Sequence, residues 1–318
     1  MNAPTAPSLR LAFFGTPEFA TPTLERLLAG RHTLVSIVSQ PDRRRGRGRR
    51  VSASPVAEVA LREGLTLLRP EKVAAPEVQE ALRASRPDLG VVVAFGQFIP
   101  KRIRELPALG FCINGHASLL PRWRGAAPIA RAILAGDPVT GISVMRLERE
   151  MDAGPVALRR EIAIGPEETA GELAARLAEL TADLVAEVLE EIAEARVEWT
   201  QQDAAQVTLA PRLERADARL DWTQPAAALA RRVCAMAPAP GAFTTLDGET
   251  LRILAARAES GRPDAAPGTV RDQPGGPLRI ASGDGWLVPR VLQRAGGKAL
   301  DVDDYLRGRP IPDGTRLE

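Results

Sequence analysis

The chain has 318 residues, 45% hydrophobic and 26% charged, with a net charge of +2, as is typical of a soluble globular protein with one large domain or two ordinary ones. Two cysteines exclude a disulfide framework and a cysteine metal cluster, and no apolar run approaches the about 20 residues that cross a bilayer. The polar, proline-rich start lacks the regions of a signal peptide, so we expect a cytoplasmic protein.

Strands and helices are predicted to alternate from residue 9 onward. The expected strands are 9–14, 33–38, 65–68, 90–95, 111–116 and 141–147, and the expected helices include 55–63, 76–84 and 125–135. Apolar strands alternating with helices indicate an α/β, Rossmann-like fold with a mostly parallel sheet. No dinucleotide fingerprint or Walker A sequence is present, so neither NAD nor ATP is indicated.

An arginine-rich segment follows the second predicted strand, and we expect it to be a loop. It holds six arginines and no acid: Arg43, Arg44, Arg45, Arg47, Arg49 and Arg50. Six like charges repel one another unless a polyanion binds, and the interspersed glycines allow the segment to follow a nucleic-acid backbone. The alternative is a solvated loop without a partner.

A carboxamide and an imidazole stand at the end of the strand predicted at 111–116. Residues two apart in a strand point to the same side, so Asn114 and His116 project together. The amide can donate to a developing oxyanion and the imidazole can exchange a proton near neutral pH, which suits acyl chemistry. A structural histidine is the alternative. Gly115 lies between the two and is expected to loosen the strand.

An aspartate follows in a predicted turn at 151–155. Asp152 is either an ordinary turn residue or a carboxylate folded back against His116, where it would orient the imidazole and favour its charged form. Beyond it, Thr169 and Glu172 predict a capping box that opens a long helix with a leucine stripe. That stripe is interpreted as core packing.

The last third of the chain changes character. One helix is predicted at 225–236, followed by short extended runs at 242–246, 250–255, 278–281 and 286–292 with glycine- and proline-rich turns between them. Short strands with frequent turns indicate a small antiparallel barrel or sandwich.

The run from Ser118 to Ile129, Ser-Leu-Leu-Pro-Arg-Trp-Arg-Gly-Ala-Ala-Pro-Ile, resembles the signature of the formyltetrahydrofolate-dependent formyltransferases, in which it follows an Asn-x-His pair. The resemblance implies a Rossmann-like catalytic domain at 1–203, a linker at 204–208 and an OB-like tRNA-binding domain at 209–318. It also implies a monomer that uses 10-formyltetrahydrofolate as formyl donor, without a metal, and the α-amine of initiator methionyl-tRNA as acceptor.

The resemblance further assigns roles to single residues. Asn114, His116 and Asp152 would be catalytic, and the arginine-rich segment would contact the tRNA, with Arg47 at its centre. Arg231, Arg232 and Lys298 are further candidates for tRNA contact. The folate pocket would be lined by Ser118, Leu119, Leu120, Pro121, Val93, Phe95 and Gly96.

Departures from the family pattern and three rival hypotheses accompany this hypothesis. Gly115 replaces a residue that is usually apolar, and Ala153 follows the aspartate where the family usually has threonine. The rivals are a related folate-dependent formyltransferase acting on an amino sugar, one acting on a glycinamide ribonucleotide, and a catalytically idle RNA-binding relative.

Overall fold

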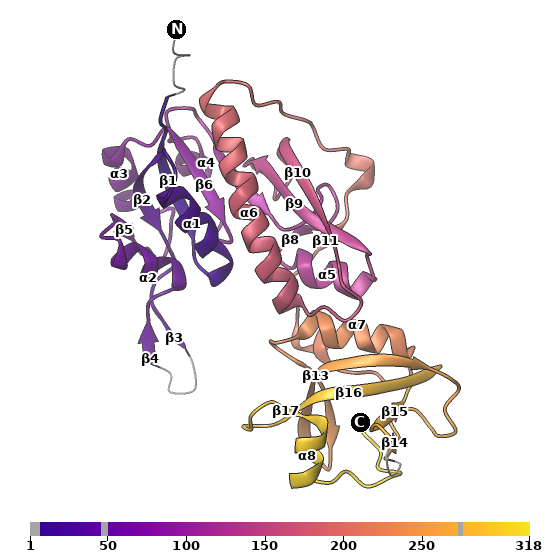
Figure 1. Cartoon of the computed structure of the whole chain (residues 1–318). Coiled ribbons are helices and arrows are strands. Elements are labelled where there is room, and N and C mark those ends of the chain that lie inside the picture. The colour runs from indigo at the N-terminus through magenta and orange to yellow at the C-terminus, as the bar shows by residue number, and fades with distance from the viewer. Residues whose placement is uncertain (1–6, 46–49, 273–275) are drawn as a thin grey trace. The chain divides into compact units, whose positions relative to one another are not determined.

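The computed structural model describes residues 7–45, 50–272 and 276–318, and its chain forms two compact units (Figure 1). The first unit comprises Met1–Gly125, Thr140–Ile162 and Ala174–Leu209. The second comprises Ala126–Val139, Ala163–Leu173 and Ala210–Glu318. Within the described ranges, no helix combines the length and the apolar character needed to cross a membrane.

A seven-stranded sheet, mainly within the first unit, has the strand order β10-β9-β7-β6-β1-β2-β5. The pairs β1–β2, β1–β6, β2–β5 and β6–β7 are parallel, and β7 pairs with β9 in antiparallel fashion. The strands are β1 (Arg10–Gly15), β2 (Thr33–Val38), β5 (Leu67–Leu68), β6 (Leu89–Val93), β7 (Cys112–His116), β9 (Val139–Arg146) and β10 (Val156–Ala163). The predicted Rossmann-like, mostly parallel sheet is confirmed.

Burial on both faces explains the apolar character of the central strands. All five residues of β6 are buried, because a parallel sheet with crossover helices is covered on both sides. The helices and short elements around the sheet are η1 (Glu18–Ala20), α1 (Thr21–Leu28), α2 (Pro55–Arg62), α3 (Pro76–Ser85), α4 (Lys101–Arg104), β8 (Arg124–Gly125), α6 (Ala170–Ala193) and η2 (Ala204–Gln206).

The capping box predicted for α6 is present. The amide of Glu172 donates to Thr169 Oγ1, and the amide of Thr169 donates to Glu172 Oε2. Along the helix Leu177, Leu184 and Val188 are fully or almost fully buried, as the leucine stripe predicted.

The arginine-rich segment is not simply the loop that we expected. Its arms form β3 (Arg43–Arg45) and β4 (Arg50–Ser52), which pair as antiparallel strands. Backbone pairing between the arms, which composition alone does not signal, accounts for the difference. Arg47 and Arg49 lie outside the described residues.

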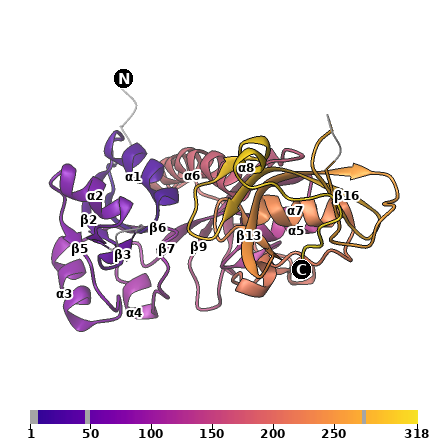
Figure 2. The same cartoon turned by 90° about the horizontal axis from the view of Figure 1, so that it is seen from below.

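The second unit is built on an antiparallel sheet, as predicted. Its strands are β12 (Ala242–Leu246), β13 (Glu249–Ser260), β14 (Val270–Arg271), β15 (Arg279–Ala281), β16 (Gly285–Arg294) and β17 (Leu300–Asp301). Helix α7 (Ala226–Met236) packs against β13 and against α5 (Pro128–Ala135), as Figures 1 and 2 show. The remaining short elements are β11 (Leu209–Ala210), η3 (Arg215–Ala218) and α8 (Val302–Gly308). Trp222, Leu229 and Ile253 belong to the core of this unit.

Candidate active site

The end of β7 presents Asn114 and His116 on one face of the sheet, as the two-residue period predicted. Asn114 pairs with Val92 of β6, and His116 pairs with Ser143 of β9. Asn114 is half-buried and His116 is 6% exposed. Both side chains therefore emerge where parallel strands end, the usual place for a ligand in such a sheet.

Gly115 faces the opposite side of the sheet, where α6 packs. A Cβ atom on Gly115 would lie 2.5 Å from Cγ2 of Thr181 and 3.4 Å from Cγ2 of Val185. Real Cβ atoms essentially never come this close to a neighbour, so the helix requires glycine at this position. We infer that Gly115 allows close packing behind the site.

Two oxygen atoms face the imidazole of His116. Its Nε2 lies 2.9 Å from the carbonyl oxygen of Trp123, and because a carbonyl can only accept, Nε2 carries the hydrogen in this arrangement. Its Nδ1 lies 3.6 Å from Oδ2 of Asp152, an ion-pair distance. The same Oδ2 accepts a hydrogen bond of 2.9 Å from the amide of Gly125. The structure thus brings Asp152 against His116.

Trp123 and Asp152 share an unusual backbone conformation. Their φ angles are 63° and 53°, in the left-handed region that costs a residue with a Cβ atom about 1–2 kcal/mol. Such conformations persist only where the surroundings hold them, and they cluster at functional sites. Gln202 and Thr208 supply part of that support through hydrogen bonds. Sequence reasoning missed both, because Thr208 lies in the predicted linker 204–208 and no motif marks Gln202 at the end of the predicted catalytic domain.

Ser118 and Ser143 shape the loop that follows β7. Ser143 Oγ donates to the carbonyl of Ser118 at 2.7 Å and accepts from the amide of Leu120 at 3.0 Å. Ser118 Oγ donates to the carbonyl of Arg122 at 2.6 Å. Both serines are fully buried, so the hydroxyl of Ser118 holds the loop from inside.

The residues predicted to line a folate pocket fall into two groups. Leu119, Leu120 and Pro121 line a hollow in the first unit. Apart from the buried Ser118, the other predicted residues lie at the end of β6 or just beyond it, and they do not line this hollow. Those are Val93 and Phe95, which are buried, and Gly96, which is exposed. The ring of Phe95 packs edge-to-face on Phe14, with centroids 5.7 Å apart, and the Phe95 carbonyl accepts from Thr16 Oγ1 and Gln40 Nε2.

The thiol on β7 is no candidate nucleophile. Burial raises the pKa of Cys112 to about 12, so the thiolate is not formed near neutral pH. Its Sγ donates to the carbonyl of Arg104. Among the described residues, no group of three His, Cys, Asp or Glu side chains is arranged to hold a metal ion.

Comparison with known proteins decides the family. The family model described as formyl transferase matches residues 9–189, and that described as formyl transferase, C-terminal domain, matches residues 212–310. The methionyl-tRNA formyltransferase of Methylococcus capsulatus is 44% identical over 309 residues, which are 97% of this chain and 99% of that protein. That of Ruegeria pomeroyi is also 44% identical, over 97% of this chain and all of its own length. The chain belongs to the methionyl-tRNA formyltransferase family.

Solved structures with low identity share the fold of this family member. HypX from Aquifex aeolicus in complex with tetrahydrofolic acid has a TM-score of 0.63 and 18% identity. The match covers 94% of this chain and 47% of the HypX chain. WlaRD, a sugar 3N-formyl transferase, has a TM-score of 0.67 and 12% identity, covering 92% of this chain and 100% of its own.

The described arginines of the β3–β4 hairpin lie on its two paired strands. Arg43 is exposed, and its Nη2 donates to Gln40 Oε1 at 3.1 Å. In the backbone pairing, Arg44 faces Val51 and Arg45 faces Arg50. Their contact with tRNA stays a prediction.

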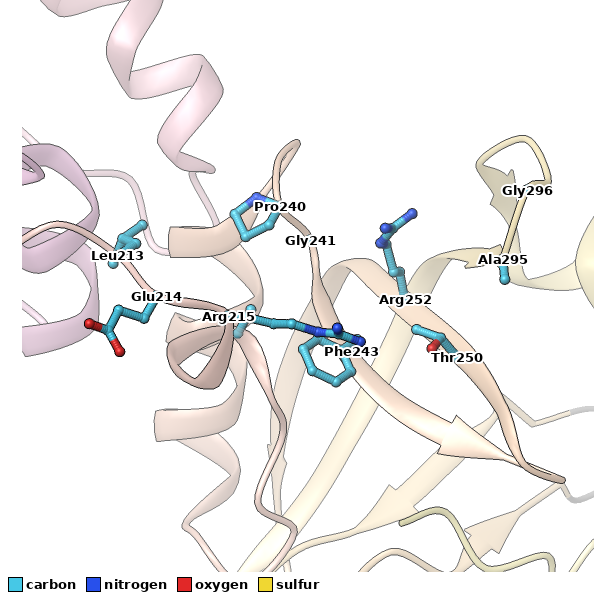
Figure 3. A pocket seen from close by; sticks show the side chains of 11 residues that line it. Leu213, Glu214, Arg215, Pro240, Gly241, Phe243, Thr250, Arg252, Ala295 and Gly296 are labelled. Carbon is cyan, nitrogen blue, oxygen red and sulfur yellow. The ribbon is translucent and has the colours of Figure 1, made fainter. Parts of the chain in front are cut away.

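A hollow of about 620 Å³ lies in the second unit (Figure 3). The guanidinium of Arg215 lies over the ring of Phe243, 5.6 Å from its centroid. Arg252 also lines the hollow, and its Nη1 donates to Gln293 Oε1 at 3.3 Å. Backbone at Gly296 borders it.

The arginines of α7 make contacts within the second unit, and their contact with tRNA stays a prediction. Arg232 Nη1 donates to the carbonyls of Asp217 and Arg219 at 3.0 and 3.1 Å. Arg231 packs its side chain against Gly136. The arginines of the hollow were not singled out from the sequence, because they are scattered along the chain.

Proposed function

We propose that this chain transfers the formyl group of 10-formyltetrahydrofolate to the α-amine of initiator methionyl-tRNA. The observation that carries the proposal is the placement of His116 beside Asn114 and against Asp152 at the carboxyl end of β7. Three polar groups suited to acyl transfer meet there, in a chain 44% identical to methionyl-tRNA formyltransferases over almost its whole length.

The reaction makes three demands on these residues. The α-amine, with an ordinary pKa of about 8, must lose a proton to attack the formyl carbon. The tetrahedral intermediate carries an oxyanion, to which the amide of Asn114 would donate, and a protonated His116 would stabilise it through its positive charge. The carbon–nitrogen bond to the folate then breaks, and the departing nitrogen takes up a proton.

Asp152 serves this scheme in either of two ways. As a base it would accept the proton of the amine, directly or through a water molecule. As an orienting group it would hold the imidazole in place beside the oxyanion, since it lies 3.6 Å from Nδ1 of His116. No covalent enzyme intermediate is needed, because the amine attacks the formyl group itself.

The partner required by this activity is a polyanion. Two features offer cations to it: the hairpin arginines, of which Arg43 is exposed, and the hollow with Arg215 and Arg252. Phosphate contacts of this kind supply most of the affinity for a nucleic acid. The folate would lie against the loop at Ser118 to Pro121 and the wall at Val93, Phe95 and Gly96.

A direct assay tests the proposal. The protein is incubated with 10-formyltetrahydrofolate and aminoacylated initiator tRNA, and formyl-methionine is measured after deacylation. Parallel reactions offer a nucleotide-linked amino sugar or glycinamide ribonucleotide as acceptor. We expect formyl-methionine and no product in the parallel reactions. Formylation of a parallel acceptor alone would replace the proposal with a rival, and RNA binding without any product would indicate an idle relative.

A further inference from the structure

The segment 200–209 is hydrogen-bonded to the two loops that face the imidazole of His116. Building on the proposed function, we propose that Gln202 and Thr208 are positioning residues for formyl transfer. Gln202 acts through Asp152, and Thr208 acts through Trp123. All of these residues belong to the first unit, although Thr208 lies in the predicted linker 204–208.

Gln202 clamps the turn that carries Asp152. Its Nε2 donates to the carbonyl oxygens of Asp152 and Gly154, both at 2.8 Å. Its Oε1 accepts from Nε of Arg124 at 3.0 Å. Both N–H groups and the oxygen of the carboxamide are therefore used. They connect the turn to the loop at Arg124 and Gly125, where the amide of Gly125 donates to the Asp152 carboxylate.

The turn requires such a clamp because Asp152 has a left-handed backbone, with φ of 53°. A residue with a Cβ atom avoids this conformation when it is free to relax. Relaxation would carry the carboxylate away from Nδ1 of His116, from which it is 3.6 Å distant. Gln202 thus fixes the distance on which the function of Asp152 depends.

Thr208 holds the other side of the imidazole. Its Oγ1 accepts from the amide of Trp123 at 2.9 Å, and its carbonyl accepts from the amide of Arg124 at 2.9 Å. Trp123, with φ of 63°, is also left-handed, and its carbonyl oxygen faces Nε2 of His116 at 2.9 Å. The hydroxyl of Thr208 therefore holds the amide of Trp123, and the carbonyl of Thr208 holds the Arg124 amide of the next peptide unit, whose oxygen sets the orientation of the ring.

Matched variants separate positioning from mere support of the fold. Gln202→Met keeps the length of the side chain, adds no charge and removes every hydrogen bond. Thr208→Val removes only the hydroxyl, and Thr208→Ser restores it. Ala205→Ser serves as the control in the same segment, because the Ala205 side chain is exposed and is not among the residues that line the hollow with Leu119, Leu120 and Pro121.

The experiment measures kcat, KM for both substrates and the thermal unfolding midpoint. We expect kcat to fall about tenfold or more in Gln202→Met and Thr208→Val, with KM nearly unchanged, since misplacing a catalytic group acts on the transition state. Thr208→Ser and Ala205→Ser should retain the wild-type kcat. In an Asp152→Asn background, Gln202→Met should lower kcat by less than about twofold, because its target is already lost.

Other outcomes overturn the inference. An unchanged kcat in Gln202→Met and Thr208→Val would do so, and so would an equal loss from Gln202→Met in both backgrounds. If Gln202→Met does not fold, the Thr208→Val and Thr208→Ser pair decides, and equal loss in both counts against positioning. A wild-type protein that forms no formyl-methionine defeats the proposed function and this inference with it, whereas an active wild type with unaffected variants defeats this inference alone.

Discussion

At the scale of single residues, the trio at the end of β7 should control the rate. We expect Asn114→Ala, His116→Ala and Asp152→Ala each to lower turnover by about a hundredfold or more, because each removes a preorganised donor or base. The unfolding midpoint should change little. Steady-state kinetics with both substrates at saturation measures the effect. Cys112→Ala, on the same strand, is the control and should keep its turnover, and a His116→Ala protein with near-normal turnover would contradict the mechanism.

The second histidine should make stability depend on pH. Burial lowers the pKa of His32 below its ordinary value of 6.5, against the opposing pull of Glu190, and His32 Nδ1 accepts from the amide of Leu9 at 3.1 Å. The unfolded chain therefore binds a proton that the folded chain resists. The contribution of His32 to stability is complete above pH 6.5. It is lost as the pH decreases from 6.5 toward the lower pKa of the folded state.

His32→Asn provides the comparison, because its amide oxygen can still accept from Leu9 but does not titrate. Urea unfolding at about pH 7.5 and about pH 5.5 should show a smaller loss of stability for the variant than for the wild type. Equal losses in the two proteins would assign the pH dependence to other groups.

How far the site could be predicted depends on the kind of contact. The shared face of Asn114 and His116 follows from strand geometry alone. Asp152 came from the resemblance, since no local rule places a turn residue against a distant imidazole. The carbonyl of Trp123 and the clamp by Gln202 could not be predicted, because a backbone oxygen has no sequence signature and the tertiary fold sets the partners of an amide.

At the scale of elements, the packing of α6 on β7 depends on one missing side chain. Gly115→Ala should destabilise the protein by about 1–3 kcal/mol, because the new Cβ meets Cγ2 of Thr181 at 2.5 Å. Thr181→Ser deletes that methyl group and can keep the bond of 2.6 Å from the hydroxyl to the Leu177 carbonyl. The double variant should therefore be more stable than Gly115→Ala alone.

Denaturant unfolding of the two single variants and the double variant measures this coupling. If the losses of the single variants simply add in the double variant, this contact is not the reason for glycine at position 115.

The β3–β4 hairpin should contribute to the salt dependence of tRNA binding. Replacing Arg43, Arg45 and Arg47 by alanine should weaken tRNA binding and reduce the slope of log affinity against log salt by up to about 0.7–0.9 for each phosphate that the variant no longer neutralises. Folate affinity should hardly change. Arg83→Ala, at an exposed arginine of α3, is the control. Superimposable salt plots for the wild type and the triple variant would mean that the hairpin does not touch the tRNA.

Element prediction succeeded where a pattern is long and periodic. The buried strand β6 and the helix α6 with its Thr169 capping box have strong local signals. The hairpin arms Arg43–Arg45 and Arg50–Ser52 were missed, because a run of arginines has neither an apolar alternation nor a strand propensity to signal pairing. The helix Val302–Gly308 was also missed, since two turns are too short for a periodic pattern.

At the scale of the whole molecule, we expect arginines of both units to contact one tRNA. Replacing Arg215 and Arg252 by alanine should weaken tRNA binding, because both line the hollow of the second unit. Combined with the hairpin variants, the losses in binding free energy should add, as they do for independent sites on one partner. Fluorescence or filter-binding titrations at constant salt measure this, with Phe243→Leu testing the ring beneath Arg215. Unchanged affinity in the Arg215 and Arg252 variant would exclude the hollow from the interface.

The bonds of Thr208 to the signature loop also restrict how the gene can be recombined. A crossover between two related genes at codon 203 would join the loop around Trp123 from one protein to residue 208 from the other. The hydroxyl and the backbone amide that it binds would then come from different proteins. A crossover after Leu209 keeps them together, in agreement with the first unit, which extends to that residue. Chimaeras that exchange the C-terminal part should therefore retain more activity when the junction follows Leu209 than when it lies at codon 203.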